Sequence, residues 1–155
     1  MKIISHRGFS DGIDESIENK PSEIESRIGE GFDVEIDLWV INSRLWLGHN
    51  EGVYKVDIEW LLEYKKNLWI HCKNQECLEK LNTIYRDLNF FWHENDLFTL
   101  TSKNYIWAYP STEIFLNAIN VLPEVNIKDS ELKKKKKILG ICTDYPKKYY
   151  SLYKN

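Results

Sequence analysis

The stretch from Phe32 to Val40 alternates between apolar and other side chains, and it constrains the fold of this chain more than any other segment. Glu35 and Asp37 lie two residues apart within it, so in a strand they point to the same face. The pattern predicts a strand over residues 32–41 that buries its other, apolar face. The apolar positions of that face are Phe32, Val34, Ile36, Leu38 and Val40.

Two carboxylates on one face of a strand need an explanation. Glu35 and Asp37 would repel each other and lose hydration unless a cation lay between them. Oxygen ligands of this kind suit Mg²⁺, Ca²⁺ or Mn²⁺. A solvent-facing polar face of an edge strand is the other interpretation, and the two residues alone leave both open.

Apolar runs and helix signals recur along the chain and predict an α/β fold. The order begins βαβαβα and then loses helices, so we expect a compact, truncated TIM-like (β/α)8 barrel with several helices missing in the C-terminal half. Such barrels usually have ~250 residues, and an open α/β sheet is the alternative. No repeat or linker divides the chain, which predicts one domain over residues 1–155.

The expected elements are as follows. Eight main strands are predicted over residues 2–5, 32–41, 68–72, 89–93, 98–101, 105–109, 118–122 and 138–143, with 44–47 as a hairpin partner of the second. Helices are predicted from Pro21 to the glycines at 29 and 31, and over 56–64, 76–86, 130–137 and 146–153. Asp57 is the expected cap of the helix over 56–64.

Charge, cysteines and apolar runs exclude several classes of protein. The formal net charge is −3, which argues against non-specific nucleic-acid binding. Three cysteines without regular spacing indicate neither a disulfide framework nor a zinc site. No apolar run approaches the ~18 residues of a membrane span, and the N-terminus lacks a signal-peptide core. These features predict a reduced, cytoplasmic protein; its oligomeric state is left open.

Two histidines follow apolar strands at positions suited to chemistry. His6 and Arg7 come directly after the first strand, where barrel enzymes place catalytic groups, and Gly8 lets the chain turn there. Histidine moves protons near neutral pH, and arginine holds phosphate through its planar donor fork. His49 ends the hairpin return. Each motif alone is weak evidence for a site.

Their combination resembles the glycerophosphodiester phosphodiesterase family. That family has His-Arg-Gly after strand one, Glu-Asn before the first helix, Glu-x-Asp on strand two, a His after a short hairpin, and a last strand ending in Thr-Asp-x-Pro. The matching segments here are His6-Arg7-Gly8, Glu18-Asn19, Glu35-Ile36-Asp37, Gly48-His49 and Thr143-Asp144-Tyr145-Pro146. The middle of the chain is much less similar.

The resemblance implies a metal-dependent phosphodiesterase that uses two histidines as general acid and base. His6 and His49 would be this pair, and Glu35 and Asp37 would bind the cation. Arg7 would contact the phosphate, and Glu18 would shape the substrate site. The substrate would be a small-molecule or glycan-linked phosphodiester, because no feature indicates nucleic acid.

The third strand departs from the family pattern. Family members carry carboxylate-x-Lys there, whereas this chain has His71-Cys72-Lys73. Lys73 fits a phosphate contact, and His71 stands where a third metal ligand is expected. Imidazole suits Mn²⁺ or Zn²⁺ better than Ca²⁺. We therefore expect Mg²⁺, Ca²⁺ or Mn²⁺, or Zn²⁺ if His71 binds; a different role for His71 or a weakened site are the alternatives.

Three further groups have two interpretations each. His93 and Asp96 are read as a polar loop, with a role as extra ligands as the alternative. Trp107 and Tyr109 are read as core residues, with a place along the cleft as the alternative. The five lysines at 133–137 are read as a solvated face, with substrate steering as the alternative.

Two other functions fit the same residues. A relative could release a cyclic phosphate by intramolecular transfer, using the same histidines and metal. A degenerate barrel could instead bind a phosphorylated ligand without cleaving it. The presence of both histidines and of the carboxylate pair favours an enzyme, because a binding protein needs no acid and base.

Overall fold

A computed structural model describes residues 1–135 and 137–154 of the chain. The strands are β1 (Lys2–His6), β2 (Asp33–Ile41), β3 (Arg44–Leu47), β4 (Tyr54–Val56), β5 (Leu68–Cys72), β6 (Phe90–Phe91), β7 (Phe98–Leu100), β8 (Ile106–Ala108), β9 (Ala118–Val121) and β10 (Gly140–Thr143). The helices are α1 (Pro21–Gly29), α2 (Ile58–Glu63), α3 (Gln75–Ile84), α4 (Asp129–Lys134) and α5 (Pro146–Lys154), with a short 3₁₀ helix η1 (Pro123–Val125).

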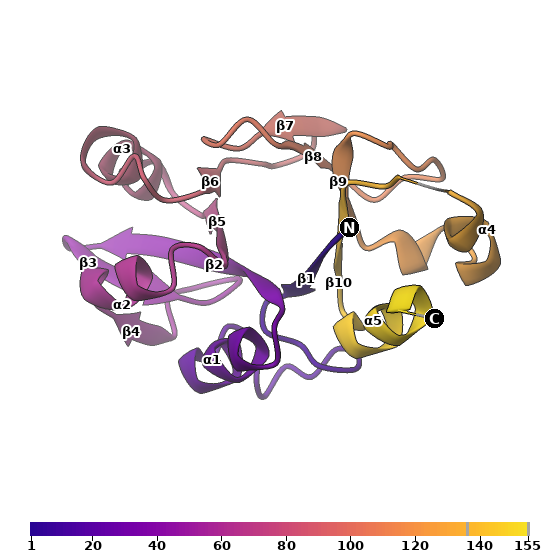
Figure 1. The fold of residues 1–155 in the computed structure, drawn as a ribbon. Helices are drawn as coiled ribbons and strands as arrows, with labels where there is room; N and C mark the ends of the chain where they lie inside the picture. Colours follow the sequence, from indigo (N-terminus) through magenta and orange to yellow (C-terminus); the bar gives the residue numbers. More distant parts are fainter. Residues whose placement is uncertain (136, 155) are drawn as a thin grey trace.

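The described strands form one curled sheet within a mixed α/β fold. Eight of them follow each other in the order β6-β5-β2-β1-β10-β9-β8-β7, and Figure 1 shows this series bending around a central space. These eight are the main strands that the sequence predicts. The neighbours pair in parallel except for β7, which is antiparallel to β8. β3 and β4 extend the sheet from the far end of β2 as an antiparallel ribbon.

The two ends of the series approach each other without forming a continuous ladder. The backbone N–H of Ser102 donates to the carbonyl of Phe90 at 2.8 Å, and the hydroxyl of Thr99 donates to the carbonyl of Trp92 at 2.9 Å. These bonds tie β6 to the β7–β8 hairpin. The described sheet is therefore curled into a half-barrel whose ladder does not close between β6 and β7.

Three apolar clusters make up the core. One fills the space inside the curl with side chains from six strands: Ile4, Trp69, Phe91, Trp107, Ile119, Val121 and Cys142. A larger cluster lies between the outer face of β2 and β5 and helices α1, α2 and α3. A third packs α4 and α5 against β10. The interior of the curl is thus a packed core at one end, and the polar residues described below lie beyond it.

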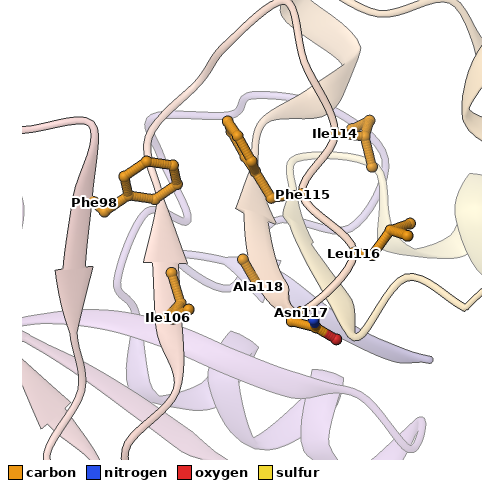
Figure 2. Close-up of a pocket in the computed structure, with 7 residues that line it drawn as sticks. All are labelled: Phe98, Ile106, Ile114, Phe115, Leu116, Asn117 and Ala118. Atoms are coloured by element: carbon orange, nitrogen blue, oxygen red, sulfur yellow. The ribbon is translucent and has the colours of Figure 1, made fainter.

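The helices cover only part of the outer surface. Figure 1 shows α1, α2 and α3 around β2 and β5, and α4 and α5 beside β10, whereas β7 and β8 have no helix beside them. In the β8–β9 region, apolar side chains line a hollow of about 590 Å³ in place of a helix (Figure 2). Phe98 and Phe115 pack edge to face across it, with ring centroids 4.7 Å apart. Residues 85–122, all of which the structure describes, form strands and loops without a helix, in agreement with the predicted thinning of helices.

Several boundaries differ from the predicted ones. β4 and η1 were not expected, and Val56 ends β4 instead of starting α2. Asp57 does cap α2, because its side chain accepts a hydrogen bond from the N–H of Trp60 at 2.9 Å. The helix expected over 130–137 ends at Lys134, and Lys136 lies outside the described residues. The described lysines of the run at 133–137 are exposed, as a solvated face requires.

The sequence predicts neither a disulfide framework nor a membrane span, and the described residues bear on both predictions. The three cysteines, Cys72, Cys77 and Cys142, are buried and unpaired. None of the helices in residues 1–135 and 137–154 has the length and apolar character needed to cross a membrane.

Candidate functional site

The register of the parallel strands brings the predicted residues together at the carboxyl ends of β1, β2 and β5. His6 lies opposite Glu35 in the β1–β2 pair, and Asp37 lies opposite His71 in the β2–β5 pair. β2 is an internal strand, and Glu35 and Asp37 are 3% and 0% exposed. The interpretation of their face as a solvated edge is therefore wrong. Both carboxylates point into the curl, where sheets of this kind place ligands.

Asp37 is the centre of the polar network. Its carboxylate is surrounded by five nitrogen-bearing side chains from three segments of the chain. Oδ2 lies 3.0 Å from Asn19 Nδ2, 3.1 Å from Arg7 Nε and 3.2 Å from His49 Nδ1, and Oδ1 lies 3.1 Å from His71 Nδ1 and 3.4 Å from Lys73 Nζ. This carboxylate therefore holds together the N-terminal loop, the hairpin end and β5.

The two carboxylates have opposite pKa shifts. Burial opposes ionisation of Asp37, but hydrogen bonds from His49 and His71 and the charges of Arg7 and Lys73 outweigh it and place the pKa of Asp37 well below its usual value. Burial and the adjacent Asp37 charge raise the pKa of Glu35, although His6, Arg7 and His71 oppose that rise. A pair with divergent pKa values inside a cleft is typical of a functional site.

His71 faces both carboxylates in the manner of a metal ligand. Its Nδ1 lies 3.1 Å from Asp37 Oδ1 and 4.0 Å from Glu35 Oε1, and its Nε2 lies 3.0 Å from the carbonyl oxygen of His93. That carbonyl can only accept, so Nε2 donates to it, and Nδ1 is the ring nitrogen that faces the two carboxylates. A ligating histidine is usually oriented through its other nitrogen in this way.

A cation fits this arrangement. Glu35, Asp37 and His71 each offer one ligand atom, and these atoms lie within 4.8 Å of one another. A divalent ion would relieve the repulsion between the two carboxylates and could bind the Nδ1 atom that faces them. Two oxygens and one imidazole suit Mn²⁺ or Zn²⁺ as well as Mg²⁺. Asp96 is not part of this cluster, so its predicted alternative role as a ligand gains no support.

His6 is held by a carboxylate to which the sequence assigned no role. Its Nδ1 lies 2.6 Å from Oδ1 of Asp144, at the end of β10. The Asp144 backbone N–H and the Thr143 hydroxyl in turn donate to Glu124 at 2.9 and 2.7 Å. Nδ1 donates to the carboxylate, so Nε2 is left to face Glu35 at 3.9 Å. Asp144 therefore fixes the tautomer and direction of His6.

Arg7 adopts a left-handed backbone conformation, with φ of 51°. This turn directs its N–H at Glu35 Oε2, 3.3 Å away, while Nη1 donates to Glu18 Oε1 at 2.7 Å and Nη2 lies 3.4 Å from Nε2 of His49. Burial disfavours the charged guanidinium, but Asp37 and Glu35 outweigh it and raise the pKa of Arg7. Glu18 thus orients the arginine, whose guanidinium lies beside His49.

Asn19 is a second residue whose role sequence reasoning missed. It is fully buried with φ of 56°, and its Oδ1 accepts a hydrogen bond from the backbone N–H of Asp37 at 2.9 Å. Together with the bond from its Nδ2 to the Asp37 carboxylate, this clamps the loop that precedes α1 onto β2. The Glu18-Asn19 motif was the available signal, but it does not reveal which partner the amide holds.

His49 depends on a glycine that no other residue can replace without strain. Gly48 has φ of 150°, and a Cβ built on it would lie 2.1 Å from the carbonyl oxygen of Glu51. The glycine carbonyl also accepts a hydrogen bond from Trp39 Nε1 at 2.7 Å, which fixes the end of the hairpin. Any side chain at residue 48 must therefore displace the loop that carries His49.

We expect Gly48→Ala to lower the free energy of unfolding by about 2 kcal/mol, because the Cβ clashes with backbone. Urea denaturation measures this loss. Gly29→Ala is the matched control, since nothing lies within 4 Å of its Cβ position, and its stability should change by no more than about 0.5 kcal/mol. Equal effects of the two substitutions would contradict the assigned strain.

Two cavities meet at this site. We call the smaller one, of about 140 Å³, the inner arm; beyond His6, Arg7, Glu35 and His71 its walls include Phe91, Trp107, Tyr109, Pro110, Val121 and Leu122. The larger one, of about 520 Å³, is the outer arm, and it extends over Phe9, Ile13, Glu15, Glu18, His49 and Asn50. His6, Arg7 and Leu122 line both arms.

Two aromatic residues predicted as core residues line the inner arm. Trp107 is 4% exposed and contributes to the core as well, whereas Tyr109 is 45% exposed, so its interpretation as a core residue is wrong. His93 also lines this arm, with its ring 4.9 Å from that of Tyr109. His93 is therefore part of the wall of the inner arm as well as of the polar loop.

Comparison of the chain with models of protein families finds no match, and comparisons with curated proteins and with solved structures find no significant match.

Proposed function

We propose that this chain is a divalent-metal-dependent phosphodiesterase that hydrolyses a glycerophosphodiester-type substrate by two-histidine general acid and base catalysis. The observation that carries the proposal is the convergence of His6, His49 and Arg7 on the Glu35–Asp37–His71 cluster. On this proposal the curled sheet is a truncated (β/α)8 barrel that has lost helices around β6 to β8. The order and spacing of the sequence motifs support the same function.

Each residue has a role that its surroundings support. Glu35, Asp37 and His71 would hold the cation, which when bound neutralises charge on the phosphoryl oxygens. Arg7 is already oriented by Glu18, and its guanidinium would bind the phosphate through its donor fork. Lys73 adds a second positive charge beside Asp37.

The two histidines both line the outer arm beside Arg7, where they could act on one phosphate. His6 has its Nδ1 on Asp144, so Nε2 is free to take or give a proton on the side of the inner arm. His49 lines the outer arm. Its Nδ1 lies within hydrogen-bond distance of the Asp37 carboxylate, and its Nε2 lies beside the Arg7 guanidinium. One ring would deprotonate the attacking hydroxyl or water, and the other would protonate the leaving alkoxide.

The metal assignment predicts that hydrolysis of bis(p-nitrophenyl) phosphate requires a divalent cation and stops in EDTA. Glu35→Gln should lower kcat/KM by about 10²–10³-fold, because it removes the charge of one ligand while keeping its shape. Titration calorimetry with Mn²⁺ should show a matching loss of metal affinity. Both measurements use the full chain.

Glu76→Gln is the matched control, because Glu76 is exposed in the first turn of α3. It should leave turnover and metal affinity unchanged. Activity that survives both EDTA and Glu35→Gln would refute the metal assignment. Phosphorus NMR of the products separates hydrolysis from the release of a cyclic phosphate by intramolecular transfer.

A further inference from the structure

The two arms of the cleft differ in size and in chemistry, although both begin at His6 and Arg7. A phosphate held there would extend one alcohol group into each arm. Each arm would therefore select one of the two alcohols independently. The residues that line each arm indicate the size and polarity of the alcohol that it can bind.

The inner arm is small and has a fixed shape. Its volume of about 140 Å³ equals that of about five water molecules, which leaves room for an alkyl group of a few carbons. The ring of Trp107 packs against Phe91 with centroids 4.6 Å apart and against Trp69 at 5.8 Å, so the core holds this wall in place. Away from the metal cluster its described lining is mostly aromatic and aliphatic, which favours an apolar group.

The outer arm is wide and open. It has a volume of about 520 Å³ and is lined by the polar loop before α1, where Ile13 is 70% exposed. Its walls come from loops rather than strands, apart from the histidine and arginine that it shares. A bulky alcohol can extend through this arm into solvent.

We propose that the substrate is an asymmetric phosphodiester with a short apolar alcohol in the inner arm and a larger alcohol in the outer arm. This inference rests on the proposed phosphodiesterase function and goes beyond it, because it names the substrate class. The chemistry at phosphorus is unchanged: water or a hydroxyl adds to phosphorus, the ester bond to the leaving alcohol breaks, and that alkoxide takes a proton from a histidine.

Hydrolysis of a series of p-nitrophenyl alkyl phosphates tests the proposal, with the cation that supports turnover present. The nitrophenyl group occupies the outer arm, and the alkyl chain samples the inner arm. Each buried methylene is worth about fourfold, so the two that separate propyl from methyl should raise kcat/KM about 15-fold. It should then fall at least about tenfold from propyl to octyl, because the longer chain exceeds the cavity.

Two variants change the inner arm in opposite directions. Val121→Phe fills it and should remove the advantage of the propyl ester over the methyl ester. Tyr109→Ala opens its rim and should reduce the octyl penalty. Val125→Phe adds the same bulk at an exposed residue of η1, outside both arms, and should keep the wild-type profile.

The outcomes separate the two proposals. If the wild-type protein cleaves every ester with equal efficiency, or if neither Val121→Phe nor Tyr109→Ala changes the profile, the substrate class is wrong and the phosphodiesterase function stands. If no ester is cleaved with any divalent cation, the proposed function fails and this inference fails with it.

Discussion

Asp37→Asn is expected to abolish phosphodiester hydrolysis and to lower the free energy of unfolding by about 3 kcal/mol. The amide keeps the shape of the carboxylate but removes the charge that faces Arg7, Lys73 and two imidazoles. With Asp37 fully buried, no water replaces the lost anion. We expect kcat/KM to fall by at least about 10³-fold, and urea denaturation measures the change in stability.

Asp33→Asn is the control for this substitution. Asp33 lies on the same strand and the same face, but its ion pair with Lys2 at 2.9 Å is at the other end of the strand and partly exposed. Its loss should cost about 1 kcal/mol or less and leave hydrolysis intact. If both substitutions have the same effect, Asp37 is an ordinary structural carboxylate and not the centre of a functional site.

His6→Ala and His49→Ala should differ in how they depend on the leaving group. The variant that has lost the general acid should cleave a p-nitrophenyl diester at near the wild-type rate, because nitrophenolate leaves without a proton. The same variant should lose about 10²–10⁴-fold on a dialkyl diester, whose alkoxide must be protonated. The variant that has lost the base should be slow on both substrates.

The activated diester is the internal control, because it reports on folding and phosphate binding in the same variant. Rates for both substrates are measured for both variants, with phosphorus NMR to follow the dialkyl ester. Equal losses for His6→Ala and His49→Ala on both substrates would contradict separate acid and base roles. The geometry would then favour a shared role in phosphate binding.

The fold was predictable where one rule decided the outcome. The alternation over residues 32–40 specified β2 and the shared face of Glu35 and Asp37, because side chains in a strand alternate strictly. The absence of helices between α3 and η1 was likewise visible as short apolar runs without helical spacing. The strand β4 was missed because three residues, Tyr54 to Val56, carry too little pattern to separate a strand from the start of a helix.

The candidate site was predictable as a set of residues but not as a network. Strand order decides that His71 lies beside Asp37, and no local pattern states which strands are neighbours. The partner of His6 is 138 residues away in the sequence, at Asp144. Tyr109 was read as a core residue because an aromatic side chain in an apolar run is usually buried, and only the curl of the sheet leaves it at the rim of a cavity.

The uneven cover of helices has a consequence for how such a protein can change over evolutionary time. The metal cluster lies on β2 and β5, which have helices behind them, whereas Trp107, Tyr109 and Pro110 of the inner arm come from β8 and the segment after it, which have no helix beside them. On the proposed function, the residues that recognise one alcohol of the substrate and the residues that bind the metal therefore lie on different parts of the same sheet. New substrates can be acquired by altering residues 107–110, while the acid, the base and the carboxylate pair stay untouched.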